Sequence, residues 1–89
     1  MFCFEYTKNA VRDLKQLDRA LAQRILKKMD FYSKQVNPLS FAKKLKDSTL
    51  GDYRFRVGDY RVLFDLTPSG KIQIITVLSV KHRREAYIE

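Results

Sequence analysis

The stretch YRFRVGDYRVLF, residues 53–64, decides the fold, because apolar and charged side chains alternate on both sides of Gly58-Asp59. Two alternating runs joined by two residues of this kind predict a β-hairpin with a tight turn. With Gly58 and Asp59 in the turn, Arg56 lies directly opposite Arg61. Because successive side chains of a strand point to opposite faces, we expect the apolar ones on one face and the arginines on the other.

Before the hairpin, the pattern is helical. Residues 2–6 are rich in aromatic side chains and predict a short first strand. Apolar side chains then recur every three or four residues from Val11 to Tyr32, which indicates an amphipathic stripe. Thr7 or Asn9 is a suitable cap for its start, and Asp18 is suited to cap a second helix, so a sharp turn near Leu17-Asp18 divides the stripe. We interpret the stripe as core, with a partner-binding groove as the alternative.

After the helices, the period changes to that of strands. Residues 39–51 predict a loop, residues 67–70 a turn, and residues 72–80 a strand that is apolar on both faces, as in the middle of a sheet. Residues 82–89 predict a short helix or tail. The order is β-α-α-β-β-β, which indicates one α+β domain over residues 1–89, with a small antiparallel sheet of about four strands packed by the N-terminal pair of helices.

Composition narrows the classes of function. Eighteen Lys and Arg against ten Asp and Glu give the 89 residues a net charge of +8, which favours a polyanion or an acidic protein as partner. Cys3 is the sole cysteine, so neither an internal disulfide nor a zinc cluster is expected, and we place it in the core. The sequence has neither a run of eighteen apolar residues nor a signal peptide, so we expect a cytoplasmic protein without a membrane span. One histidine, one cysteine and scattered carboxylates make no ligand cluster, and there is no Gly-rich phosphate loop, so we expect neither a metal nor a cofactor.

Three arginines on one sheet face suggest a phosphate-binding surface. Arg54, Arg56 and Arg61 share that face in the predicted register, and like charges directly opposite each other destabilise a sheet unless an anion neutralises them. The planar guanidinium binds phosphate through two parallel hydrogen bonds. A merely solvated basic face is the alternative.

The C-terminal run adds ionisable groups that could reach this face from the end of the last strand: Lys81, His82, Arg83, Arg84 and Tyr87. Such a set suits RNA cleavage by the substrate's own 2′-hydroxyl, because the enzyme then only positions the strand, transfers two protons and stabilises charge. His82 and Tyr87 are the candidates for proton transfer.

The segments KKLKDSTLGDYRFRVGDYRVLFDL and ITVLSVKHRREAYIE resemble the RelE/ParE superfamily of bacterial and archaeal toxins of type II toxin–antitoxin systems. The resemblance covers nearly the whole chain and implies a small antiparallel sheet with two helices packed against it. It also implies one of two activities. RelE-like members cleave mRNA in the ribosomal A site without a metal, whereas ParE-like members poison DNA gyrase and lack the basic catalytic set.

Carried over from the RelE branch, the resemblance implies a catalytic set of basic residues and one tyrosine: Arg54, Arg56, Arg61, His82 or Arg83, and Tyr87. Its first two positions are often lysine in the family. Arginine is a poor general base, so the proton-accepting role falls to Tyr87 or His82. We expect further basic residues to contact RNA or the ribosome: Lys43, Lys44, Lys46, Lys81 and Arg84.

The resemblance also implies partners. These are mRNA, the ribosome and a RelB-like antitoxin whose segment, acidic in keeping with the +8 charge, wraps the toxin; operator DNA is contacted only through the antitoxin complex. The leading function is therefore a ribosome-dependent mRNA endoribonuclease toxin. A ParE-like gyrase inhibitor and a nucleic-acid-binding relative that does not cleave are the alternatives.

Overall fold

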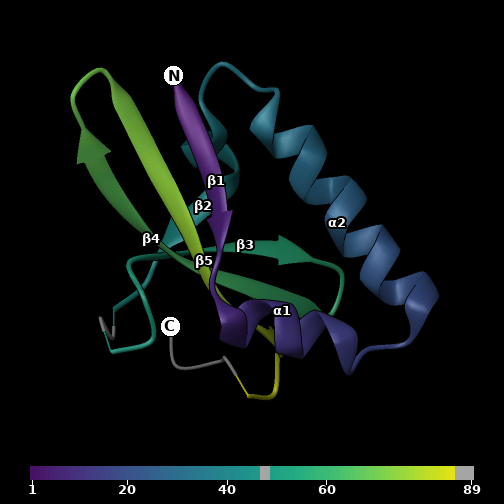
Figure 1. The fold of residues 1–89 in the computed structure, drawn as a ribbon. Helices are drawn as coiled ribbons and strands as arrows, with labels where there is room; N and C mark the ends of the chain where they lie inside the picture. Colours follow the sequence, from purple (N-terminus) through teal and green to yellow (C-terminus); the bar gives the residue numbers. More distant parts are fainter. Residues whose placement is uncertain (47–48, 86–89) are drawn as a thin grey trace.

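A computed structural model describes residues 1–46 and 49–85. It confirms the α+β class and, apart from one additional strand, the order of elements (Figure 1). In chain order the elements are β1 (Phe2–Tyr6), α1 (Lys8–Lys15), α2 (Arg19–Ser33), the 3-10 helix η1 (Pro38–Phe41), β2 (Ala42–Lys44), β3 (Tyr53–Val57), β4 (Tyr60–Ser69) and β5 (Ile72–His82).

Two side-chain caps divide the helical stripe as predicted. The Thr7 hydroxyl accepts the Ala10 N–H at 3.1 Å and starts α1. The Asp18 carboxylate accepts the Leu21 N–H at 3.4 Å and starts α2. Each cap satisfies one of the backbone donors that a helix N-terminus leaves without a partner. The second helix, α2, ends at Ser33, directly after the last residue of the predicted stripe.

The five-stranded sheet has the order β1-β5-β4-β3-β2. It differs in two respects from the small antiparallel sheet expected. Its first strand runs parallel to β5, from Phe2 opposite Gln73 to Tyr6 opposite Val77, so the sheet is mixed. A fifth strand, β2, pairs antiparallel with β3 inside the segment predicted as a loop, residues 39–51.

The hairpin register is confirmed pair by pair. Val57 lies opposite Tyr60 and Arg56 lies opposite Arg61, and the pairs further from the turn keep the same register. Gly58 has a φ of 59°, the left-handed value that a type II′ turn requires at its first central residue. The second predicted turn, residues 67–70, is narrower than expected, because β4 continues to Ser69 and only Gly70 and Lys71 form the bend.

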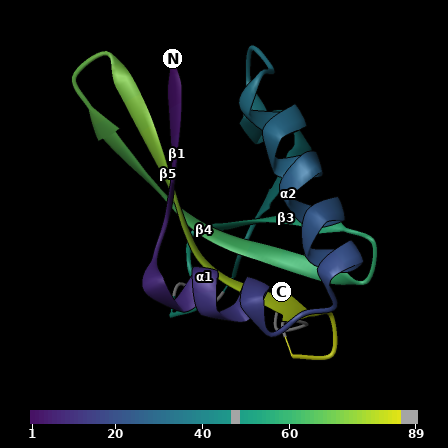
Figure 2. The same ribbon diagram turned by 45° about the vertical axis from the view of Figure 1, so that its right-hand side comes forward.

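Both helices cover one face of the twisted sheet, and Figure 2 shows α1 lying across β5 with α2 beside β3. The core between the layers contains Phe55 and Phe64, whose stacked rings lie 4.6 Å apart, and Tyr32 stacks on Phe55 at 4.4 Å. Cys3 is exposed rather than part of this core, because it alternates with Phe2 and Phe4 on the opposite side of β1. No helix among the described residues is long and apolar enough to cross a membrane.

Candidate functional site

The sheet face turned away from the helices gathers basic side chains from four adjacent strands. The pairings place Lys43 opposite Arg54, Arg56 opposite Arg61, and Arg61 opposite Lys81. We call these five residues the cationic face. Their neighbours in sequence, such as Phe55 and Val62, point into the core on the other side.

Arg61 is the most enclosed member of the cationic face. Only 8% of the surface of Arg61 is exposed to solvent. Its Nη1 donates to the carbonyl oxygens of Gly58 at 3.2 Å and Tyr60 at 3.1 Å, so the guanidinium is tied to the hairpin turn. A charge held in this way is preorganised, because little side-chain freedom remains to be lost when an anion binds. Arg54 is half-buried and Arg56 is exposed.

A β-bulge decides which C-terminal residue joins this face. Leu63 pairs with Ser79 but Phe64 pairs with Val77, so Leu78 has no partner on β4. The extra residue reverses the alternation of the rest of β5. Lys81 therefore lies beside Arg61 on the cationic face, whereas His82 lies opposite Tyr60 on the side of the helices.

The remaining C-terminal residues lie around the end of β5. The His82 ring meets the Tyr60 ring edge-on at 5.2 Å, and its Nδ1 accepts the Arg84 N–H at 3.2 Å. Arg83 Nη1 lies 3.8 Å from the Asp59 carboxylate at the hairpin turn, with the Arg83 side chain exposed. The structure thus brings Arg83 near the turn but directs His82 away from the cationic face. Tyr87 lies outside the described residues.

Only one of the three predicted lysines before the hairpin belongs to the cationic face. Lys43 does, since it pairs with Arg54. Lys44 pairs with Tyr53, so its side chain points to the opposite face of the sheet from that of Lys43. Lys46 follows the end of β2. All three are exposed.

Away from the 58–59 turn, apolar and acidic side chains border the cationic face. Leu63 is 1% exposed because Leu45 and Leu50 pack on it. Further along β4, the Asp52 N–H donates to Asp65 at 3.0 Å, and burial together with the nearby Asp52 raises the pKa of the Asp65 carboxyl. Positive charge is therefore concentrated at the end of the sheet that carries the 58–59 turn.

An apolar groove of about 530 Å³ lies on the other side of the molecule, between the two helices and the end of β1. Val11 and Leu26 are among its lining residues and stay exposed, and Lys15 and Arg19 contribute basic groups to it. These exposed apolar side chains are therefore not packed into the hydrophobic core. Burial, with Asp30 nearby, raises the pKa of the Tyr6 phenol in the same groove.

The comparisons with known proteins agree with the overall fold. The family model of the ParE toxins of type II toxin–antitoxin systems (parDE) matches residues 4–87. Curated protein sequences gave no significant match.

Three solved toxin–antitoxin complexes have the same fold. The matching chain of the RelBE2 complex of Mycobacterium tuberculosis is 28% identical to this protein in sequence. Its TM-score is 0.68, over 90% of this chain and 95% of that one. The archaeal RelE–RelB complex of Pyrococcus horikoshii is 30% identical, with a TM-score of 0.66 over 92% and 94%. The RelB–RelE complex of Methanococcus jannaschii is 28% identical, with a TM-score of 0.61 over 93% and 94%.

With a family model covering nearly the whole chain and an archaeal RelE relative 30% identical over most of it, the protein belongs to the RelE/ParE superfamily as a toxin of a type II toxin–antitoxin system.

Proposed function

We propose that this toxin is a ribosome-dependent endoribonuclease that cleaves mRNA without a metal and so inhibits translation in the cytoplasm. The observation that carries the proposal is the cationic face. Arg56, Arg61 and Lys81 form one continuous row across β3, β4 and β5, and Lys43 and Arg54 form a second row beside it. Like charges in direct opposition cost stability, and a bound polyanion removes that cost.

The chemistry asks little of the protein beyond what this face offers. The 2′-oxygen of the substrate attacks the adjacent phosphorus, and the bond to the 5′-oxygen of the next nucleotide breaks. A 2′,3′-cyclic phosphate and a 5′-hydroxyl result, so one proton is removed and one is supplied. We assign stabilisation of the negative charge on the phosphoryl oxygens to Arg61, because its guanidinium is bound to two backbone carbonyl oxygens and it is the most buried cation of the face.

The remaining roles follow from position. Lys81, on β5 next to Arg61, takes the catalytic role that the resemblance gave to His82 or Arg83. Arg54, Arg56 and Lys43 bind neighbouring phosphates. We assign proton transfer to Tyr87 rather than His82, since the His82 ring is turned away and its Nδ1 already accepts a backbone N–H.

Gyrase inhibition is the second candidate, because the family model that matches residues 4–87 is that of the ParE toxins. The basic rows favour the nuclease, since the gyrase-directed branch lacks this set. Primer extension on mRNA from translating cells separates the two. The nuclease predicts new 5′ ends within codons soon after induction, with plasmid supercoiling unchanged. Relaxed plasmid with intact mRNA would establish gyrase inhibition instead.

We further propose an antitoxin partner, supported by the three solved relatives, which are toxin–antitoxin complexes. An acidic antitoxin segment would cover the cationic face or displace the C-terminal residues. Hydrogen exchange of the toxin, alone and bound, should then show new protection over residues 54–61 or changed protection over residues 81–89. Protection confined to residues 11–26 would place the partner in the groove between the helices.

A further inference from the structure

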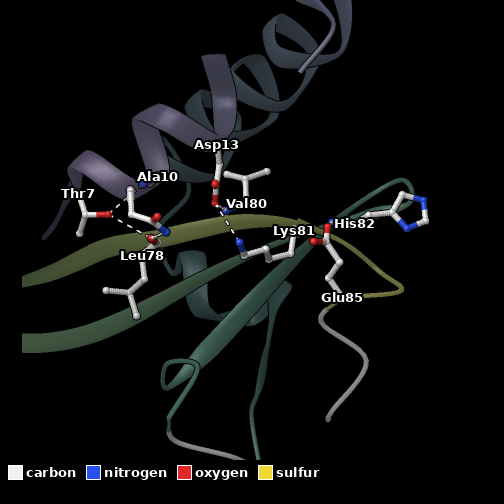
Figure 3. Close-up of polar contacts among 9 residues, drawn as sticks. Thr7, Ala10, Asp13, Leu78, Val80, Lys81, His82 and Glu85 are labelled. Atoms are coloured by element: carbon white, nitrogen blue, oxygen red, sulfur yellow. Dashed lines mark hydrogen bonds and ion pairs between the residues drawn. The ribbon is translucent and has the colours of Figure 1, made fainter. Parts of the chain in front are cut away.

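The edge of β5 beyond the end of β1 is covered by side chains from α1 and from its N-cap residue, Thr7. β1 pairs with β5 only as far as Tyr6 opposite Val77, and the chain then turns into α1. Past that point, no strand within residues 1–46 and 49–85 pairs with this edge of β5. The carbonyl oxygen of Leu78, the bulged residue, accepts from Thr7 Oγ1 and from Asn9 Nδ2, both at 3.1 Å (Figure 3).

Asp13 makes the next contact along this edge. Its Oδ2 accepts the Val80 N–H at 2.9 Å and lies 3.8 Å from Lys81 Nζ. Figure 3 shows the Asp13 side chain reaching from α1 to the strand between these two groups, with His82 pointing away from them. The Asp13 side chain is only 12% exposed, whereas that of Lys81 is 36% exposed.

The two contacts have different consequences. The hydrogen bond to the backbone holds the carboxylate in place, because both groups belong to regular elements and the carboxylate is largely shielded from water. The ion pair then places a negative charge beside a lysine that faces Arg61 across the sheet. Without it, Lys81 and Arg61 repel each other in the absence of RNA.

We propose that Asp13 is a positioning residue, which fixes Lys81 at the end of the cationic face by binding the Val80 N–H and the Lys81 ammonium with one carboxylate. Asp13 itself does not contact RNA. The inference rests on the proposed nuclease function, in which Lys81 binds the phosphate beside Arg61. Thr7 and Asn9 secure the bulge that directs Lys81 to this face, and Asp13 determines where its ammonium group lies.

The test is Asp13→Asn, which keeps an oxygen acceptor for the Val80 N–H but removes the charge. Asp30→Asn is the matched control, because Asp30 also pairs with a lysine, Lys34 at 3.0 Å, but on the exposed side of α2. With purified ribosomes programmed with mRNA, we expect Asp13→Asn to lower kcat about tenfold or more through misplacement of Lys81. KM should not rise, because the face loses no positive charge. Asp30→Asn should change neither constant.

A double-mutant cycle shows whether the effect passes through Lys81. In a Lys81→Gln background, Asp13→Asn should cause no further loss of kcat, because the group that Asp13 positions is gone. An equal loss in both backgrounds, an unchanged kcat for Asp13→Asn alone, or a raised KM with kcat unchanged would each overturn the proposal. Should Asp13→Asn not fold, Asp13→Glu, which displaces the carboxylate by one methylene, replaces it with the same expected outcome.

A second measurement separates this inference from the proposed function. If the wild-type protein does not cleave mRNA, the proposed function has failed, and Lys81 is examined directly by NMR of lysine labelled at Cε. We expect Asp13→Asn to shift the Lys81 signal and Asp30→Asn to leave it in place. An identical Lys81 signal in wild type and Asp13→Asn would refute the role of Asp13 whatever the protein's activity.

Discussion

Replacing Arg61 with alanine separates catalysis from folding. Among the contacts that the change removes are two hydrogen bonds from the Arg61 guanidinium to the carbonyl oxygens of Gly58 and Tyr60. Such bonds contribute about 1.5–3 kcal/mol each when both groups are buried. Here the Gly58 carbonyl belongs to an exposed turn, so water replaces much of the loss. Removing the charge also relieves the repulsion from Arg56, worth roughly 0.2–1 kcal/mol.

The net cost in stability is therefore about 1–2 kcal/mol. For a domain of this size, each kcal/mol lowers Tm by about 4–8 °C. A domain with an unfolding free energy of about 5 kcal/mol or more stays almost entirely folded after such a loss. Removing a preorganised group that stabilises the transition state lowers the rate on the order of 100-fold or more, equivalent to about 2.7 kcal/mol. Loss of folded protein cannot produce a fall in rate of that size.

The assay is cleavage of ribosome-bound mRNA by purified variants, with thermal unfolding measured on the same samples. Arg61→Ala should lose cleavage at a temperature well below its Tm. Arg61→Lys keeps the charge without the planar fork and should recover part of the rate. Arg12→Ala, which removes an exposed arginine from α1, should behave as wild type. Arg61→Ala that cleaves at the wild-type rate would show that Arg61 is not part of the active site.

Three further predictions concern proton transfer, pH and RNA binding. Tyr87→Phe should slow cleavage strongly without weakening ribosome binding, whereas His82→Gln should cleave nearly as wild type; the reverse result would transfer the acid–base role to His82. Burial and Asp52 raise the pKa of Asp65, so its contribution to the unfolding free energy falls as pH rises from about 4 through that raised pKa. Asp65→Asn should therefore be more stable than wild type at pH 7, by less than about 1 kcal/mol, and the difference should disappear near pH 3 in thermal melts; a constant difference would contradict this origin. Binding to ribosomes should weaken steeply with salt, and the slope against salt concentration should be smaller when alanine replaces three lysines together: Lys43, Lys44 and Lys46.

The hairpin was predictable from the sequence to the level of single pairs. The alternation in residues 53–64 and the Gly58-Asp59 turn are local signals, and a two-residue turn leaves a single register in which the apolar side chains share a face. The division of the helices was predictable for the same reason, because Asp18 can cap only the helix that follows it.

The remaining features depend on contacts between distant segments. β2 has three residues and no alternation of its own, so only its pairing with β3 makes it a strand. The parallel pairing of β1 with β5 has no local signature either. Consecutive apolar side chains in residues 72–80 conceal the bulge at Leu78, and without the bulge's position the sequence does not show whether Lys81 or His82 lies beside Arg61.

The most direct test of the proposed function is cleavage of a defined mRNA on purified ribosomes, compared with the same mRNA carrying a single 2′-deoxynucleotide in the A-site codon. We predict a cut within the A-site codon of the unmodified mRNA that needs no divalent metal beyond that which keeps the ribosome assembled. The products should be a 2′,3′-cyclic phosphate and a 5′-hydroxyl. The 2′-deoxy position should resist cleavage, because the attacking oxygen is missing. Equal cleavage at the 2′-deoxy position would contradict the proposal. Ribosome-bound mRNA that stays intact in the presence of the wild-type toxin would also contradict it.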